Sequence, residues 1–272
     1  MPARSQQPVA VVTGASRGIG LEVCRQLAAL GYLVVLGSRD QRRAEVAAKE
    51  LDPEGTRVVS AHVEVDNSVN IDQLAQWIRD RYGRVDAIVN NAATPPDQWG
   101  IAGTSDLSPV AEALDVNLFG AWRVIQALLP LLRSSPRPRI VNVSSEAGSI
   151  ALMSGGRPAF SVSKAALNAL TRTLAGELYR DGILVNAVCP GPVTPDGARG
   201  SGRSAAQGAA SVVWAVTLPN GGPTGTFTRD GRELPWLPVR RASRGAGQPA
   251  ASRPLPGGRG PGRCPSRAPG CG

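Results

Sequence analysis

The pair Phe160 and Lys164 bears most directly on possible chemistry in this sequence, and the reaction to consider first is hydride transfer to a carbonyl group. As hydride reaches a carbonyl carbon, negative charge develops on the oxygen, and a positioned donor must stabilise and then protonate it. Lys164 stands four residues after Phe160, so the two would share one face of a helix. A redox site built around this pair would need a phenol at position 160, and phenylalanine has no proton to give.

A glycine-rich turn near the N-terminus has the pattern of a dinucleotide-binding loop. The apolar run Val9–Val12 predicts a buried strand, and the turn Thr13–Gly20 follows it and leads into apolar residues at helical spacing. At such a strand-to-helix junction Gly14 supplies an unusual backbone angle, Gly18 lets a diphosphate approach, and Gly20 lets the helix lie close to the strand. The helix would then present its N-terminal amides to the anion.

The rest of the chain alternates strand-like and helix-like segments without an internal repeat. This alternation predicts one α/β domain with a single doubly wound, Rossmann-like parallel sheet and helices on both faces. The expected strands are 9–12, 33–36, 58–65, 87–89, 140–143, 184–188 and 226–228. The expected helices lie near 19–30, 41–51, 69–81, 107–133, 158–180 and 204–217. Ligands of such sheets bind beyond the carboxyl ends of the strands, which is where the motifs lie.

The two ends of the chain fall outside this domain, which we expect to span residues 8–239. Residues 1–7 are an N-terminal extension, and residues 240–272 are rich in Arg, Pro and Gly with almost no large apolar side chain. Such a tail cannot bury enough surface to offset its ordering entropy, so it is expected to be disordered. Two interpretations of it stay open: a polyelectrolyte arm, or an extension without function that a shifted reading frame would produce.

The charge of the chain is concentrated in that tail. The whole sequence has a net charge of +9, but seven arginines and no acid lie in residues 240–272, which leaves 23 basic against 21 acidic residues elsewhere. A nearly neutral domain gives little support to a nucleic-acid partner. DNA binding through the tail stays as a third interpretation, and it would show as strongly salt-sensitive binding.

Other functional classes find little support. No apolar run approaches membrane-spanning length and the N-terminus lacks the apolar core of a signal peptide, so we expect a cytoplasmic protein without a membrane partner. The four cysteines have neither metal-ligand nor disulfide spacing, which fits a reducing compartment. His62, the only histidine, has no cysteine or histidine near it in the sequence, so no metal site is expected.

Taken together, the motifs resemble the short-chain dehydrogenase/reductase family, and the stretch 153–170 is similar to its carbonyl reductases. The resemblance covers about residues 8–238. It rests on the glycine turn and on five further segments in the family's order. These are Asn90–Ala93, Val116–Gly120, Ser144–Ser145, Ser163–Thr171 and Pro190–Gly191. The resemblance implies a homodimer or homotetramer that pairs the helices near 107–133 and 158–180 with their copies.

The resemblance also assigns the catalytic roles. In the family a tyrosine protonates the carbonyl oxygen, a serine hydrogen-bonds it, a lysine lowers the pKa of the tyrosine, and an asparagine holds a water. The matching positions are Phe160, Ser145, Lys164 and Asn117. Phe160 thus replaces the general acid, and Ser145 with a bound water is the substitute donor. Ser161 is expected to point elsewhere.

The cofactor implied by the resemblance is a nicotinamide dinucleotide, and charge predicts NADP(H) rather than NAD(H). A 2′-phosphate needs cations, whereas an unphosphorylated ribose prefers a carboxylate after the second strand. That strand runs into Ser38 and Arg39, with Arg17 in the glycine turn, although Asp40 follows and opposes the preference. The cofactor-binding positions are Gly14, Ser16, Arg17, Gly18, Ile19, Gly20, Ser38, Arg39, Glu64, Val65, Asn91, Ala92, Ala93, Lys164, Pro190, Gly191 and Val193. Of these, Ala93 stands where the family has glycine.

Residues 192–210 are rich in Gly, Ala, Arg and Ser, which predicts a mobile substrate lid, with an unordered loop as the alternative. Pro195 stands where the family has a threonine that binds the nicotinamide amide.

Two functions stay open. One is an NADP(H)-dependent oxidoreductase for a small carbonyl or alcohol substrate, with activity weakened by Phe160. The other is a non-catalytic NADP(H)-binding sensor or scaffold.

Overall fold

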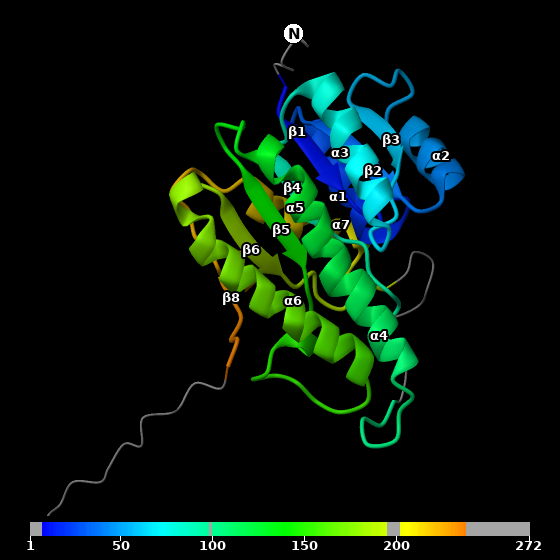
Figure 1. The fold of residues 1–272 in the computed structure, drawn as a ribbon, viewed down its shortest axis with the longest axis vertical. Coiled ribbons are helices and arrows are strands. Elements are labelled where there is room, and N and C mark those ends of the chain that lie inside the picture. The colour runs from blue at the N-terminus through cyan, green and yellow to red at the C-terminus, as the bar shows by residue number, and fades with distance from the viewer. Residues whose placement is uncertain (1–6, 98–99, 195–201, 238–272) are drawn as a thin grey trace, which may run out of the picture. The chain divides into compact units, whose positions relative to one another are not determined.

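The computed structural model describes residues 7–97, 100–194 and 202–237. Within these residues eight strands form one sheet in the order β3-β2-β1-β4-β5-β6-β7-β8 (Figure 1). They are β1 (Val9–Val12), β2 (Leu33–Ser38), β3 (Val58–His62), β4 (Ala87–Asn90), β5 (Arg139–Val143), β6 (Leu184–Val188), β7 (Phe227–Arg229) and β8 (Arg232–Glu233). All neighbouring strands run parallel except β7 and β8. The order therefore switches direction between β1 and β4, which is where doubly wound sheets bind their ligands.

Helices cover both faces of the sheet. They are α1 (Gly18–Ala29), α2 (Gln41–Leu51), α3 (Ser68–Tyr82), α4 (Ser108–Leu114), α5 (Ala121–Leu132), α6 (Pro158–Glu177) and α7 (Ala205–Val216), with short helical turns η1 (Asp115–Gly120), η2 (Glu146–Gly148) and η3 (Tyr179–Asp181). Alternate residues of β1 serve two buried cores: Val9 and Val11 pack with α3, α5 and α6, whereas Ala10 and Val12 pack with α1, α2 and α7 (Figure 1). The predicted fold class is confirmed.

Two strands differ from the sequence prediction. The third strand was expected to reach residue 65 but ends at His62, because the amide of Glu64 donates to the side chain of Asn70 (2.8 Å) and the chain turns toward α3. The short strand β8 was not expected. It follows a turn in which Asp230 and Gly231 both have positive φ, at 52° and 73°, and a hairpin of two residues a side leaves almost no periodic signal.

The expected helix over 107–133 is three segments instead of one. A π-helical turn, η1, separates α4 from α5, with Asn117 inside it. Such turns insert one residue into a helix and often mark functional sites. Here a Cβ on Gly120 would lie 2.7 Å from Cγ2 of Val65, so the glycine lets the turn approach the loop after β3.

The segment 192–210, which was predicted to be a lid, is not a loop throughout. Ser204 begins α7 with a capping box that it shares with Gln207, so residues 205–210 are helical. Residues 195–201 of the lid, most of the N-terminal extension and the tail from residue 240 lie outside the described residues. In the described part of the chain, no helix combines the length and the apolar character that crossing a bilayer requires.

Candidate functional site

The glycine turn after β1 can form only with glycine at two of its positions. Gly14 has a φ of +62°, and a Cβ there would lie 2.7 Å from the Cα of Ala92. A Cβ on Gly20 would lie 2.5 Å from the side-chain nitrogen of Asn91 and 2.8 Å from the Cα of Ala15. The turn therefore packs directly against the loop that follows β4, at the point where the strand order switches.

Thr13 and Asn91 lock these two loops together. The hydroxyl of Thr13 accepts hydrogen bonds from the amides of Asn91 (3.1 Å) and Ala92 (3.0 Å). The side chain of Asn91 donates in return to the carbonyl oxygens of Thr13 (2.9 Å) and Gly14 (3.0 Å). These four hydrogen bonds fix the edge of the sheet beside α1 before any ligand arrives.

The N-terminus of α1 is left open to an anion. Arg17 occupies the cap position with an extended backbone and no capping hydrogen bond, and the first turn holds no acid. By contrast, Asp40 caps α2 and Asn67 caps α3 with side-chain oxygens. The free amides and the helix dipole both favour negative charge, so a pyrophosphate of a dinucleotide fits this position. Gly18 has φ +60° and open space around it, which leaves the approach clear.

The ends of β2 and β3 hold the residues expected at the adenosine end of a dinucleotide. Ser38 donates to the hydroxyl of Ser16 (3.1 Å), which ties the end of β2 to the glycine turn. A cavity of about 590 Å³ adjoins it, lined by Arg39, Glu64 and the residues that begin α3. Glu64 is partnered there, since it contacts His62 (3.3 Å) and accepts from Asn67 (3.2 Å).

Asp40, the acid that argued against a 2′-phosphate, is turned toward α2. Its carboxylate accepts from the amide of Arg43 (3.0 Å) and pairs with the guanidinium of the same residue (3.0 Å). Arg39 and Arg17 are exposed and have no hydrogen bond or ion pair within the part of the chain that the structure describes. Arg39 therefore offers an unpaired positive charge to this cavity, whose wall also includes the carboxylates of Glu64 and Asp66.

Lys164 lies buried on α6 next to Phe160. Its ammonium donates to the carbonyl oxygen of Val143 (2.8 Å), at the end of β5, and lies 5.7 Å from the centre of the Phe160 ring. Burial lowers the pKa of Lys164 from 10.5 to about 8. A cation held at this place would lower the pKa of a phenol at position 160, but the ring that it faces carries no hydroxyl.

Because of this pKa, the free energy of unfolding should change with pH in the alkaline range. Between pH 8 and 10.5 the unfolded chain still holds the Lys164 proton that the folded chain has lost, so the free energy of unfolding should rise with pH. We expect up to about 3 kcal/mol across this window. The measurement is urea unfolding of the native chain and of Lys164→Met at both pH values. Equal pH slopes in the two proteins would contradict the shifted pKa.

Asn117 is held inside η1 by both of its side-chain atoms. Its oxygen accepts from the amide of Thr94 (2.9 Å), after β4, and its nitrogen donates to the hydroxyl of Ser163 (2.9 Å) on α6. Ser163 donates in turn to the carbonyl oxygen of Phe160 (2.9 Å). Asn117 thus connects the loop after β4 to the turn of α6 that carries Phe160 and Lys164.

Ser145 lies two residues after the end of β5 and caps η2. Its hydroxyl accepts from the amide of Ala147 (3.2 Å), and the residue is partly exposed. The turn that follows lies against α6, since a Cβ on Gly148 would be 2.7 Å from the carbonyl carbon of Lys164. The residues expected to be catalytic therefore share one end of the sheet.

The segment after β6 connects to α1 and α7. Gly191 has a φ of +82°, and Val193 pairs with Arg203 in a parallel bridge. Arg203 forms two hydrogen bonds to the carboxylate of Asp230, both 2.7 Å long. On the other side, a Cβ on Gly208 would lie 2.8 Å from Val193 and 3.5 Å from Ile19. Val193 thus lies near the glycine turn, while Pro195 is outside the described residues.

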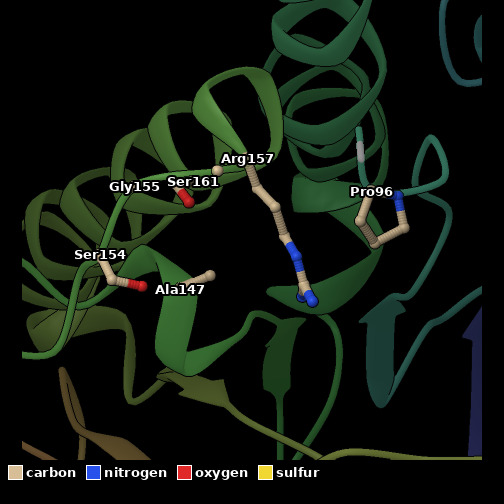
Figure 2. A pocket seen from close by; sticks show the side chains of 7 residues that line it. Pro96, Ala147, Ser154, Gly155, Arg157 and Ser161 are labelled. Carbon is tan, nitrogen blue, oxygen red and sulfur yellow. The ribbon is translucent and has the colours of Figure 1, made fainter. Parts of the chain in front are cut away.

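A cavity of about 540 Å³ opens beside the N-terminal end of α6. Its wall consists of Pro96, Ala147, Ser154, Gly155, Gly156, Arg157 and Ser161 (Figure 2). Ser161 was expected to point elsewhere, and that expectation was wrong, because its side chain faces this cavity. Arg157 was missed. Its position three residues before Phe160 was the available signal, but the pairing of Gly100 with Gly156 that shapes the wall was not readable from sequence.

Comparison with known proteins identifies a family that this chain matches. Residues 8–205 match the family described as short chain dehydrogenase. The chain is 33% identical to "Short-chain dehydrogenase/reductase 1" of Saponaria officinalis, over 82% of this chain and 94% of that protein. It is 31% identical to "(-)-isopiperitenone reductase" of Mentha piperita, over 81% and 96% of the two chains. The solved structure of salutaridine reductase from Papaver somniferum superposes with a TM-score of 0.71 at 29% identity, over 81% of this chain and 99% of that one.

Proposed function

We propose, because this chain belongs to the short-chain dehydrogenase/reductase family, that it is an NADP(H)-dependent oxidoreductase for a small carbonyl or alcohol substrate. Phe160 weakens the activity of this enzyme. The observation that carries the proposal is the uncapped N-terminus of α1, which lies behind a glycine turn that is fixed against the loop after β4. When bound, the cofactor supplies the hydride.

In this proposal the protein binds the cofactor and holds the proton-handling groups. The amides of the glycine turn bind the pyrophosphate, and Asn91, Ala92 and Ala93 lie along the dinucleotide. Lys164 binds the nicotinamide ribose, and Ser145 hydrogen-bonds the carbonyl oxygen as charge develops on it. Because Phe160 cannot donate, protonation of that oxygen falls to a water beside Ser145.

The names of the relatives support the substrate class. The Mentha piperita and Papaver somniferum proteins are both named as reductases, and this chain covers nearly their whole length. The test is consumption of NADPH by the native chain with a panel of aldehydes and ketones. Because losing a general acid costs about 100- to 10,000-fold in rate, slow turnover is expected and only of the more reactive carbonyls. Turnover with NADH alone would contradict the cofactor preference.

A second candidate function is a non-catalytic NADP(H)-binding sensor or scaffold. The ring of Phe160 beside the buried Lys164 favours it, since the glycine turn is retained while the proton donor is missing. Both candidates predict that NADP(H) binds. They differ in turnover, and in whether restoring a tyrosine restores it.

The cofactor preference makes a separate prediction about Arg39. Replacing Arg39 by aspartate should raise the dissociation constant of NADPH by about 10- to 100-fold, because a charge-assisted contact to the 2′-phosphate contributes about 1.5–3 kcal/mol. The affinity for NADH should stay the same or improve. Fluorescence titration of both coenzymes measures this, with Arg180→Asp on the exposed turn η3 as the control. Equal losses for both coenzymes in Arg39→Asp would refute the preference.

The assembly and location of the protein stay predictions. Phe119 and Trp122, on η1 and α5, are 45% and 38% exposed, which supports a homodimer or homotetramer that covers them. Sedimentation of the native chain tests this, and a monomer at high concentration would oppose it. A cytoplasmic location also stays an expectation.

A further inference from the structure

We propose that Arg157 makes the site selective for carbonyl substrates that carry a carboxylate. The inference rests on the proposed function, because it names a substrate class for that same site. It starts from the cavity beside α6, whose volume of about 540 Å³ is ordinary for a small-molecule site.

The position of the cavity fits a substrate. One wall is Ala147, two residues after Ser145, and another is Ser161, next to Phe160 on α6. Pro96, from the segment after β4, lies opposite (Figure 2). A molecule in this space would therefore contact the loop of Ser145 and the helix of Lys164 together.

Arg157 brings a positive charge into the space. It is the residue before α6, and its carbonyl oxygen accepts from the amide of Ser161 (2.9 Å). Figure 2 shows its side chain extending between Ala147 and Pro96. Within the described residues its guanidinium has no hydrogen bond and no ion pair.

The acidic residues nearest in sequence to the cavity wall already have hydrogen-bond or ion-pair partners. Asp97 accepts from the amides of Ala159 (3.2 Å) and Phe160 (3.0 Å), where it caps α6. Glu146 pairs with Arg229 at 2.8 Å. Neither carboxylate forms a described ion pair with Arg157, so the guanidinium stays available to an anion, while Asp97 keeps its own charge at the start of α6. A guanidinium in a concave site attracts a carboxylate and can bind both of its oxygens.

Two hydroxyls line the same cavity as Arg157. Ser154 and Ser161 both line the cavity, and their oxygens point into it (Figure 2). Ser161 is only 4% exposed, and its hydroxyl has no partner among the described residues. A nearly buried hydroxyl donor without a partner gains a hydrogen bond when a carboxylate arrives. The wall of the cavity thus carries an arginine and two hydroxyl donors.

The test compares para-formylbenzoate with its methyl ester, which differ in charge but share the aldehyde. Calorimetry, with and without NADP⁺, should show the acid binding at least about tenfold more tightly than the ester to the native chain. Arg157→Gln should remove this preference by weakening the acid alone, Arg157→Lys should keep part of it, and Arg180→Gln should keep all of it. Added salt should weaken only the acid.

Equal affinity of acid and ester for the native chain would overturn the proposal, as would a preference that survives in Arg157→Gln. Arg157 is exposed, so its variants should keep the native melting temperature, which is checked first. Failure of the proposed function looks different. In that case neither coenzyme binds. The titrations of the coenzyme-free protein with the acid and with the ester still show whether the cavity prefers the carboxylate.

Discussion

Replacing Phe160 by tyrosine is expected to raise the rate of NADPH-dependent carbonyl reduction by about 100- to 10,000-fold. The variant adds one hydroxyl to a ring whose centre already lies 5.7 Å from the Lys164 ammonium. With a pKa of about 8, that ammonium is mostly charged at neutral pH and would lower the pKa of the new phenol. The turn that follows Ser145 lies against α6 at Lys164.

The controls for this prediction come from the same chain. Phe119→Tyr makes the same chemical change at an exposed position on η1 and should leave the rate unchanged. Adding Lys164→Met to Phe160→Tyr should remove most of the gain, because the phenol then loses its cation. The absorbance of NADPH follows all four proteins with one aldehyde. A gain below about tenfold would place the defect outside position 160 and favour a non-catalytic role.

Replacing Gly20 by alanine should weaken coenzyme binding by about 100-fold, or nearly 3 kcal/mol. The added Cβ would lie 2.8 Å from the Cα of Ala15 and 2.9 Å from the carbonyl oxygen of Gly14, and neither backbone can move without changing the turn. It would also lie 2.5 Å from the side chain of Asn91, which joins the turn to the loop after β4. The amides that should bind the pyrophosphate would then be displaced.

Gly176→Ala is the matched control for this variant. Gly176 lies on α6 with open space around its missing Cβ, so alanine there should stabilise the helix by about 0.5–1 kcal/mol and leave coenzyme affinity unchanged. Urea unfolding separates the two effects, since Gly20→Ala should also cost about 1–3 kcal/mol of stability from overpacking. Undiminished affinity in folded Gly20→Ala would show that the turn does not bind the coenzyme.

Much of the fold could be predicted because its strands are short apolar runs. Val9–Val12 and Leu184–Val188 are buried along their whole length, and a strand covered by helices on both faces leaves that continuous signal. The glycine turn was equally readable, because Gly14 and Gly20 occupy positions that no other residue fits. These features depend on neighbours in the sequence or on backbone geometry alone.

Two side chains at the site differ from the sequence prediction. Asp40 looked like an acid beside the ribose, but its carboxylate caps α2 and pairs with Arg43. Ser161 looked like a residue that points away from the site, but the loops at Pro96 and Ala147 close a cavity around it. Asp40 contacts a residue only three positions later, as an N-cap does, whereas the loops around Ser161 are distant in the sequence and periodicity does not report them.

The central claim is that a nicotinamide dinucleotide binds at the carboxyl ends of the strands with its pyrophosphate at the N-terminus of α1. Calorimetric titration of the folded native chain with NADPH, and separately with NADH, tests it most directly. We expect one NADPH to bind per chain, more tightly than NADH. Absence of measurable binding by either coenzyme at millimolar concentration would contradict the claim.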